Sequence, residues 1–221
     1  MTPERGGRRT RRPSDLLQVL ADSPTEADRV VAARAPETPP AALSRLGFDH
    51  DAAVRIAVLT NPACPWDVLA AHLSGPDGPE LQHAAAHPGT PRDEVAHLLT
   101  SEHPGRRAAG AANPHLTAED CDLLSQDPDP TVRAALAANE LAFPTSLATF
   151  PSDQDPRVRE ALAANPSVPL ALLGGLRISD VPSWQARSFI DRSVPDQGAR
   201  AKALQRLAEA SGEMVLAALL L

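Results

Sequence analysis

The sequence predicts an all-α solenoid, in which 26-residue repeats alternate an α-helix with a shorter helix and no β-sheet forms. Two segments of nearly identical sequence, 127–139 and 153–165, stand 26 residues apart. Proline recurs with the same step at six of eight possible positions, which are Pro13, Pro39, Pro65, Pro91, Pro169 and Pro195. No segment alternates apolar and polar residues over the length of a strand.

The first helix of each repeat is expected to begin at an acidic cap and to end at an asparagine. Asp129 and Asp155 are suitable N-caps, and the proline after each of them suits the first helical position. The asparagine column contains Asn61, Asn113, Asn139 and Asn165, with His87 as a variant. Most of these residues precede proline, which disfavours helical geometry in the residue before it. We expect Asx turns here, with hydrogen bonds between stacked turns.

The second helix of each repeat follows the recurring proline. Its pattern is Pro-x-x-x-Leu-x-x-Leu, a segment of about eight residues that is short enough to be partly 3₁₀. Near Phe143 the proline is displaced by one position, to Pro144, and we expect a loop one residue longer there.

Apolar columns indicate which side of each helix faces inward. One column of the first helix contains Val54, Val132, Val158 and Trp184, and one of the second helix contains Leu17, Leu43, Leu69, Val95, Cys121, Leu147 and Leu173. About four buried side chains in a repeat cannot offset the conformational entropy of ordering 26 residues. No repeat is therefore expected to fold alone, and stability must come from stacking.

Charge and composition divide the chain into three parts. Residues 1–12 hold five arginines against one glutamate, so we expect a disordered basic arm of net charge +4. Residues 13–198 hold about seven repeats and residues 199–221 a capping helix with an apolar tail. The tail is expected to cover the last repeat, with docking to a second copy or a partner as the alternative. No secretory signal or membrane span is recognisable, which favours the cytoplasm.

The repeat resembles a known family. The run Asp-Pro-Asp-Pro-Thr-Val-Arg-Ala-Ala-Leu-Ala-Ala-Asn, followed in other repeats by Pro-x-x-Pro-x-x-Leu-Leu, is similar to the leucine-rich repeat variant family over roughly residues 13–207. The resemblance implies α and 3₁₀ helices wound into a right-handed superhelix. Some relatives add a cysteine-rich segment that binds an iron–sulfur cluster. Cys64 and Cys121 match no such segment, so we expect no cofactor.

An arginine column is the most regular polar feature. It contains Arg29, Arg55, Arg107, Arg133 and Arg159, interrupted by Leu81 and Gln185. A ladder of guanidinium groups could form an interaction surface for carboxylates or phosphates. The alternative, which we favour, is structural: Asp51, Asp129 and Asp155 lie four residues before an arginine and neutralise it locally, while the arginine stem covers apolar surface.

Other candidate sites are weaker. Six of the seven histidines lie between His72 and His115, and His83 with His87 and Glu80 could share a metal ion, although none of the familiar metal motifs is present. We expect no metal site there. Catalytic serine motifs and glycine-rich phosphate loops are missing, and neither cysteine has a local catalytic signature, so we expect no enzyme.

These observations favour a non-catalytic repeat protein that offers an extended surface to a protein partner, with no membrane role and a possible homo-oligomer through the apolar tail. The alternative is a nucleic-acid-associated, HEAT-like protein that uses the arginine column and the basic arm. Residues 13–221 carry a net charge of −11, and HEAT units need about 40 residues or more, so nucleic-acid binding is disfavoured. An enzyme assembled across repeats is a third possibility.

Overall fold

The computed structural model describes residues 12–212 and 214–221, and this part of the chain is helical throughout. It contains fourteen α-helices, three short 3₁₀ helices and no β-strand, only an isolated bridge between Arg177 and Val215. This confirms the all-α class. The predicted basic arm of residues 1–12 falls outside the described residues except for Arg12, which precedes the first helix. The chain divides into two compact units, one ending at Thr90 and the other beginning at Pro91.

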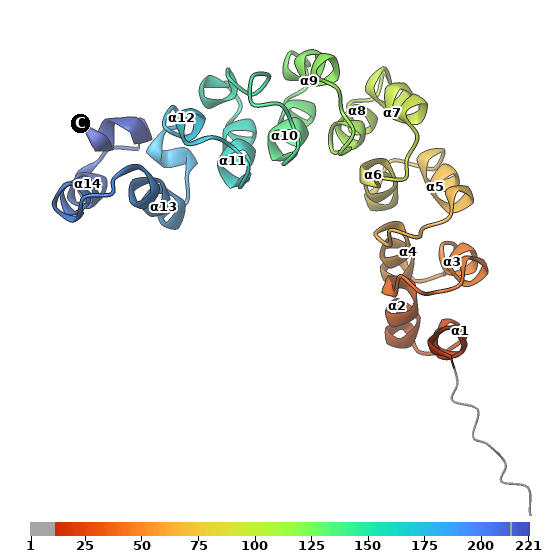
Figure 1. Ribbon diagram of the computed structural model, residues 1–221. Coiled ribbons are helices and arrows are strands. Elements are labelled where there is room, and N and C mark those ends of the chain that lie inside the picture. Colours follow the sequence, from red (N-terminus) through yellow and green to blue (C-terminus); the bar gives the residue numbers. More distant parts are fainter. Residues whose placement is uncertain (1–11, 213) are drawn as a thin grey trace, which may run out of the picture. The chain divides into compact units, whose positions relative to one another are not determined.

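The first unit contains three helix pairs. They are α1 (Pro13–Ala21) and α2 (Glu26–Arg34), α3 (Pro40–Leu46) and α4 (Ala52–Leu59), and α5 (Trp66–Leu73) and α6 (Pro79–Ala86). The first helices of successive repeats form a row, because α2 packs on α4 and α4 packs on α6 (Figure 1). Neighbouring repeats are therefore in direct contact within this unit.

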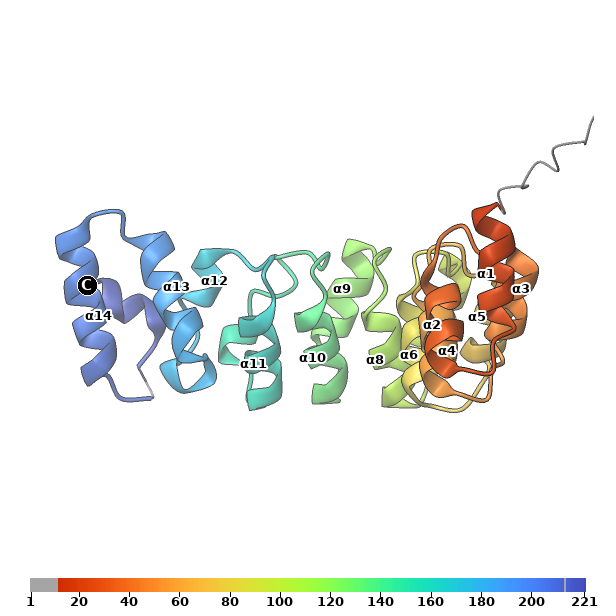
Figure 2. The same ribbon diagram turned by 90° about the horizontal axis from the view of Figure 1, so that it is seen from below.

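The second unit continues the pattern and then departs from it. Its helices are α7 (Arg92–Leu99), α8 (Pro104–Ala111), α9 (Ala118–Ser125), α10 (Pro130–Ala138), η1 (Phe150–Ser152), α11 (Pro156–Ala164), α12 (Leu170–Leu173), η2 (Ile178–Asp180), α13 (Ser183–Ser193), α14 (Gln197–Glu209) and η3 (Leu216–Leu220). Within it, α8, α10 and α11 lie side by side as a row of first helices (Figure 2).

The capping residues and prolines mark the ends of helices, as their positions in the sequence predict. The Asp129 carboxylate accepts a hydrogen bond from the Thr131 N–H, and the Asp155 carboxylate accepts one from the Arg157 N–H. Both predicted N-caps are thus confirmed. The second helices α3, α5, α7 and α9 are α-helical. After Phe143, where the proline is displaced, no α-helix forms and the chain runs through turns into the 3₁₀ helix η1.

The predicted inward columns are buried almost throughout. Val54, Val132 and Val158 are fully buried, and so is Cys121, which occupies a leucine position. The remaining members of the second-helix column from Leu43 onward are buried as well, whereas Leu17, in the first helix of the chain, is half-buried. In the second unit, burial of the same positions in successive repeats makes one continuous apolar layer from Val95 to Leu219.

Trp184 does not belong to this layer, and its predicted inward position is wrong. Its side chain is 68% exposed, whereas Ala186 and Ile190 are buried. These two residues follow Val158 and Leu162 by 28 residues instead of 26, because the chain includes η2 before α13 begins. The longer connection shifts the register by two residues and moves Trp184 to the first turn of α13.

The C-terminal tail folds back on the last repeats, as predicted for a cover. Leu216 and Leu219 are buried. The Leu216 N–H donates to the Leu176 carbonyl and the Ala217 N–H donates to the Gly174 carbonyl, each over 2.9 Å. Docking of the still exposed Leu221 to a second copy stays a prediction. Among the described helices, none has both the length and the apolar character needed to cross a membrane.

Candidate functional site

The arginine column lies at one position of the helix row. Each of the five arginines is the fourth residue of its helix: Arg29 in α2, Arg55 in α4, Arg107 in α8, Arg133 in α10 and Arg159 in α11. The side chain at this position starts close to the loop before the helix. It can therefore reach both its own loop and the loop of the adjacent repeat.

Each guanidinium group grips a carboxylate of the following repeat. The Arg133 Nε donates to Asp153 Oδ2 over 2.8 Å, and its Nη2 donates to Oδ1 over 2.9 Å. The same two-pronged contact joins Arg29 to Asp49, Arg107 to Asp127 and Arg159 to Asp180, while Arg55 holds a single oxygen of Glu80. Planar, bidentate pairing is the strongest geometry available to an arginine and a carboxylate.

The remaining guanidinium nitrogen of each arginine, Nη1, donates to a backbone carbonyl in the loop before its own helix. The Arg133 Nη1 donates to the backbone carbonyl of Asp127 over 2.7 Å, and Asp127 is the residue whose carboxylate holds Arg107. The Asp127 carboxylate also accepts the backbone N–H of Asp129. One aspartate thus connects the arginine of the preceding repeat with the arginine of its own repeat. A chain of such contacts runs through Asp127, Asp153 and Asp180 along the row of first helices.

The predicted partners of the arginines are wrong. Within the described residues, Asp51, Asp129 and Asp155 form no ion pair with the arginine four residues later. Asp129 and Asp155 cap their own helices, and Asp51 pairs with Arg29 of the preceding repeat over 2.6 Å. The true partner stands 20 residues later in three of the five cases. The groups are also largely buried instead of exposed: Arg29 and Arg159 are 6% and 9% exposed.

Burial and pairing with arginine have opposite effects on the pKa of the aspartates that bind the arginine column. Burial by itself raises the pKa of Asp127, but the hydrogen bonds from Arg107 and from the Asp129 backbone outweigh it and hold the pKa below its ordinary value. The same balance lowers the pKa of Asp49 and of Asp153. The hydrogen bond that Arg133 donates to the Asp153 carboxylate raises the pKa of Arg133. The pairs are therefore ionised at neutral pH, and their charges hold neighbouring repeats together.

The asparagine column forms a second set of contacts between repeats. The Asn165 Nδ2 donates to the carbonyls of Ala137 and Asn139 in the preceding repeat, and its Oδ1 accepts the Ser167 N–H. Asn61 and Asn139 make the same three contacts with their own neighbours. The prediction of Asx turns and hydrogen bonds between stacked turns is confirmed for these residues.

In its repeat, His87 makes hydrogen-bond contacts equivalent to those of the column asparagines. Its Nδ1 accepts the Gly89 N–H, and its Nε2 lies 2.9 Å from the Asn61 carbonyl, the acceptor in the preceding repeat. Both ring nitrogens are therefore engaged. Glu80 pairs with Arg55. Two of the three residues that the sequence suggested for a metal ion, His87 and Glu80, are thus occupied in contacts between repeats.

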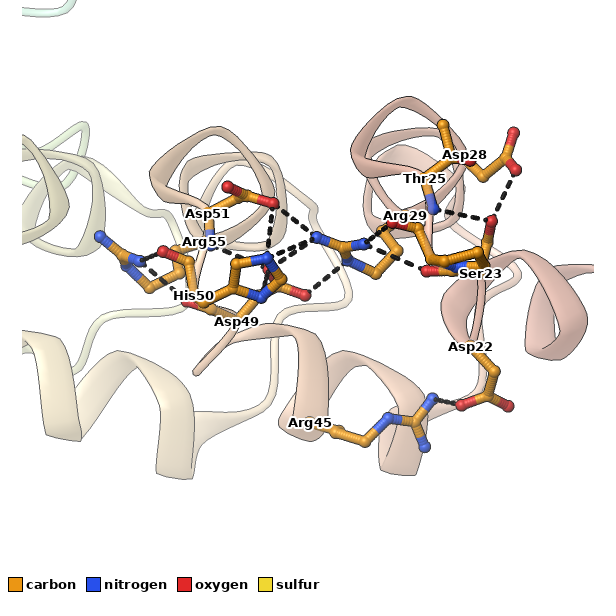
Figure 3. A network of polar contacts seen from close by, with 11 residues as sticks. Asp22, Ser23, Thr25, Asp28, Arg29, Arg45, Asp49, His50, Asp51 and Arg55 are labelled. Carbon is orange, nitrogen blue, oxygen red and sulfur yellow. Dashed lines mark hydrogen bonds and ion pairs between the residues drawn. The ribbon is translucent and has the colours of Figure 1, made fainter.

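Figure 3 shows the polar contacts around Arg29, where three neighbouring side chains could ligate a metal ion. Asp49, His50 and Asp51 have carboxylate and ring atoms within 4.8 Å of one another. Arg29 contacts both carboxylates, at 2.8 and 2.6 Å. The Arg29 guanidinium group already supplies the two carboxylates with the positive charge that a metal ion would bring.

Neither cysteine has the environment of a nucleophile. Burial, with a smaller contribution from Asp67, raises the pKa of Cys64 to about 12. Burial also raises the pKa of Cys121, which is fully buried. Both thiols therefore stay protonated at neutral pH, and a protonated thiol is a poor nucleophile.

Large apolar side chains remain exposed outside these contacts. The most exposed in the second unit are Leu123, Leu141 and Trp184, each above 60%, and Leu221 at the chain end. In the first unit they include Phe48, Val31, Val19 and Leu16, each above 50%. The sequence pattern placed Trp184 in an inward column and did not single out the other residues, which lie off the periodic columns.

The comparisons with known proteins add no relative: neither a protein-family model, nor a curated protein, nor a solved structure matches this sequence significantly.

Substituting Arg133 with methionine should destabilise the second unit. The Arg133→Met change leaves the Asp153 carboxylate buried without its partner, and we expect a loss of about 2 kcal/mol in the free energy of unfolding. Urea unfolding followed by Trp184 fluorescence in a Trp66→Phe background measures it. Arg157→Met is the matched control, because Arg157 pairs with Asp155 in an exposed position and should change stability little. Equal losses in the two variants would contradict the structural role of the column.

Acid should weaken both units. The unfolded chain binds a proton at each aspartate near pH 4, whereas the paired aspartates of the folded chain bind it only at lower pH. Stability is therefore fully present above about pH 5 and decreases as pH falls through the lowered pKa values. Urea unfolding measured across this range tests it. In Asp153→Asn the pH dependence should be shallower, and identical profiles for the two proteins would refute the assignment.

His87 should be replaceable by asparagine. The Asn side chain offers the same acceptor and donor, so we expect His87→Asn to change the free energy of unfolding by less than about 1 kcal/mol. His87→Leu removes both contacts and should cost about 1 to 3 kcal/mol. Unfolding followed by Trp66 fluorescence in a Trp184→Phe background reports on the first unit. Similar stability of the asparagine and leucine variants would show that the ring contacts contribute nothing.

Proposed function

We propose that the chain is a non-catalytic helical-repeat protein, of the leucine-rich repeat variant kind, that binds a protein partner in the cytoplasm. One observation carries the proposal. The side chains that recur with the repeat are engaged inside each unit, whereas the exposed large apolar side chains stand outside the periodic columns. Exposed apolar side chains that packing within the unit does not use are available to a partner.

The charges favour a protein over a nucleic acid. The five column arginines hold carboxylates and backbone carbonyls, so their charge is compensated at short range. Phosphate binding would require these groups to exchange an ionised partner for another anion. The net charge of −11 on residues 13–221 adds a long-range repulsion for a phosphate backbone.

Affinity capture of binding proteins from the native cell extract, with the chain and its variants as baits, tests the proposal. The full chain, a chain without residues 1–12, and a Leu123→Ser, Leu141→Ser double variant serve as baits. We expect one protein to bind the first two baits and to bind the double variant more weakly, because exposed apolar contacts are lost while the fold is retained. The captured protein is then purified and titrated against the full chain to obtain the stoichiometry and the affinity.

A salt titration of DNA binding examines the alternative directly. Contacts with phosphate weaken steeply as ionic strength rises, whereas we expect no binding with that dependence here. Steeply salt-dependent DNA binding that is lost with residues 1–12, together with no protein that binds the purified chain, would overturn the proposal.

A further inference from the structure

An open pocket of about 450 Å³ lies in the second unit between α11 and the start of α13. Its walls include Glu160 of α11, Asp180 of η2, and Pro182, Trp184 and Gln185 around the first turn of α13. This volume falls in the range of sites that bind small ligands or single side chains. Helices α11 and α13 are labelled in Figure 1.

The pocket exists because the repeat is interrupted here. In the regular part of the row, α8 packs on α10 and α10 packs on α11. Beyond α11 the chain inserts η2, on which α11 packs, while α13 packs on α12 and α14. The two-residue change of register then brings Trp184 and Gln185 to the first turn of α13, where they line the open space.

A buried acceptor in this pocket has no donor. Gln185 Oε1 is shielded from solvent and has no hydrogen-bond partner, the only such side-chain atom among residues 12–212 and 214–221. Leaving a buried carbonyl oxygen unpaired is unfavourable, and native proteins rarely do so without a reason. Gln185 also lines the pocket, so a rotation of its side-chain amide would present this oxygen to an N–H group of a ligand.

The other polar groups of the wall select the charge of that ligand. Glu160 adds an exposed carboxylate, and the Asp180 carboxylate is already held by Arg159. No lysine or arginine lines the pocket within the described part of the chain. Trp184, 68% exposed, adds the face of an indole ring, the best aromatic partner for a cation. The wall therefore combines acceptors, a negative charge and an aromatic surface.

We propose that this pocket binds an arginine side chain from an extended, basic segment of the protein partner. The guanidinium group stacks on Trp184, pairs with Glu160 and donates an N–H to Gln185 Oε1 once the Gln185 amide has turned toward the pocket. Arginine fits better than lysine, because its planar group stacks on an aromatic ring and directs donors to several sides at once. The net negative charge of residues 13–221 attracts a basic segment from a distance. The inference rests on the proposed protein-binding function and specifies the chemistry of the partner.

A peptide titration on the full chain tests the pocket. The probe is acetyl-Gly-Arg-Arg-Gly-amide, and the control peptide replaces both arginines by citrulline, which keeps the shape without the charge. In a Trp66→Phe background Trp184 is the sole tryptophan, and we expect a saturable change in its fluorescence with the arginine peptide. By calorimetry the citrulline peptide should bind at least about tenfold more weakly. Equal binding of the two peptides would overturn the proposal.

Variants separate the pocket from general attraction to an acidic protein. We expect Trp184→Ala to weaken peptide binding about tenfold, whereas Trp66→Ala, the matched change in the other unit, leaves it unaltered. Gln185→Met removes the unpaired acceptor. It should weaken binding while the melting temperature of the free protein stays the same or rises, a combination that a purely structural role would not produce. Equal affinities of Trp184→Ala and Trp66→Ala would refute the site.

The two proposals fail in different ways. If the captured partner binds Trp184→Ala as tightly as the unaltered chain, the pocket is not its site, and the protein-binding function still stands. If the arginine peptide binds with the expected variant pattern but no partner protein binds the purified chain, the pocket chemistry is supported and the proposed function is wrong. If Trp184→Ala loses partner binding and the arginine peptide binds with the expected variant pattern, both proposals are supported.

Discussion

Each repeat of this protein depends on its neighbour, because a pair of short helices cannot bury enough apolar surface to fold alone. Two polar devices reinforce the apolar layer between repeats. Arginines such as Arg133 clamp an aspartate of the following repeat, and asparagines such as Asn165 hydrogen-bond carbonyls of the preceding one. The two sets reach in opposite directions along the chain. The repeat that contains Arg133 and Asn139 is therefore held at both of its faces.

This dependence explains why the most regular residues are not the ones that we assign to function. A side chain that recurs in every repeat meets the same neighbour in every repeat, and stacking uses it. Function is then expected where periodicity fails. The insertion of η2 after α12 is such a place, since it exposes Trp184, leaves Gln185 Oε1 without a donor and opens a pocket beside α11.

The same devices adapt to local change. His87 replaces an asparagine because its two ring nitrogens match the acceptor and the donor of the amide. Glu80 replaces an aspartate on Arg55, and Asp180 holds Arg159 although it stands one residue further along than in the regular repeats. What persists is the contact between repeats, not the residue type or the spacing.

The sequence by itself determined the N-caps of α10 and α11, the Asx turns and most of the buried columns, because these depend on short-range signals such as Asp129, the prolines and the spacing of Val132 and Leu136. Only the tertiary structure decided which carboxylate each arginine holds. The choice of Asp153 over Asp129 for Arg133 depends on how repeats stack, because Asp153 lies 20 residues away along the chain. It also decided the exposure of Trp184, since a two-residue shift of register follows from packing around η2 and leaves no periodic signal.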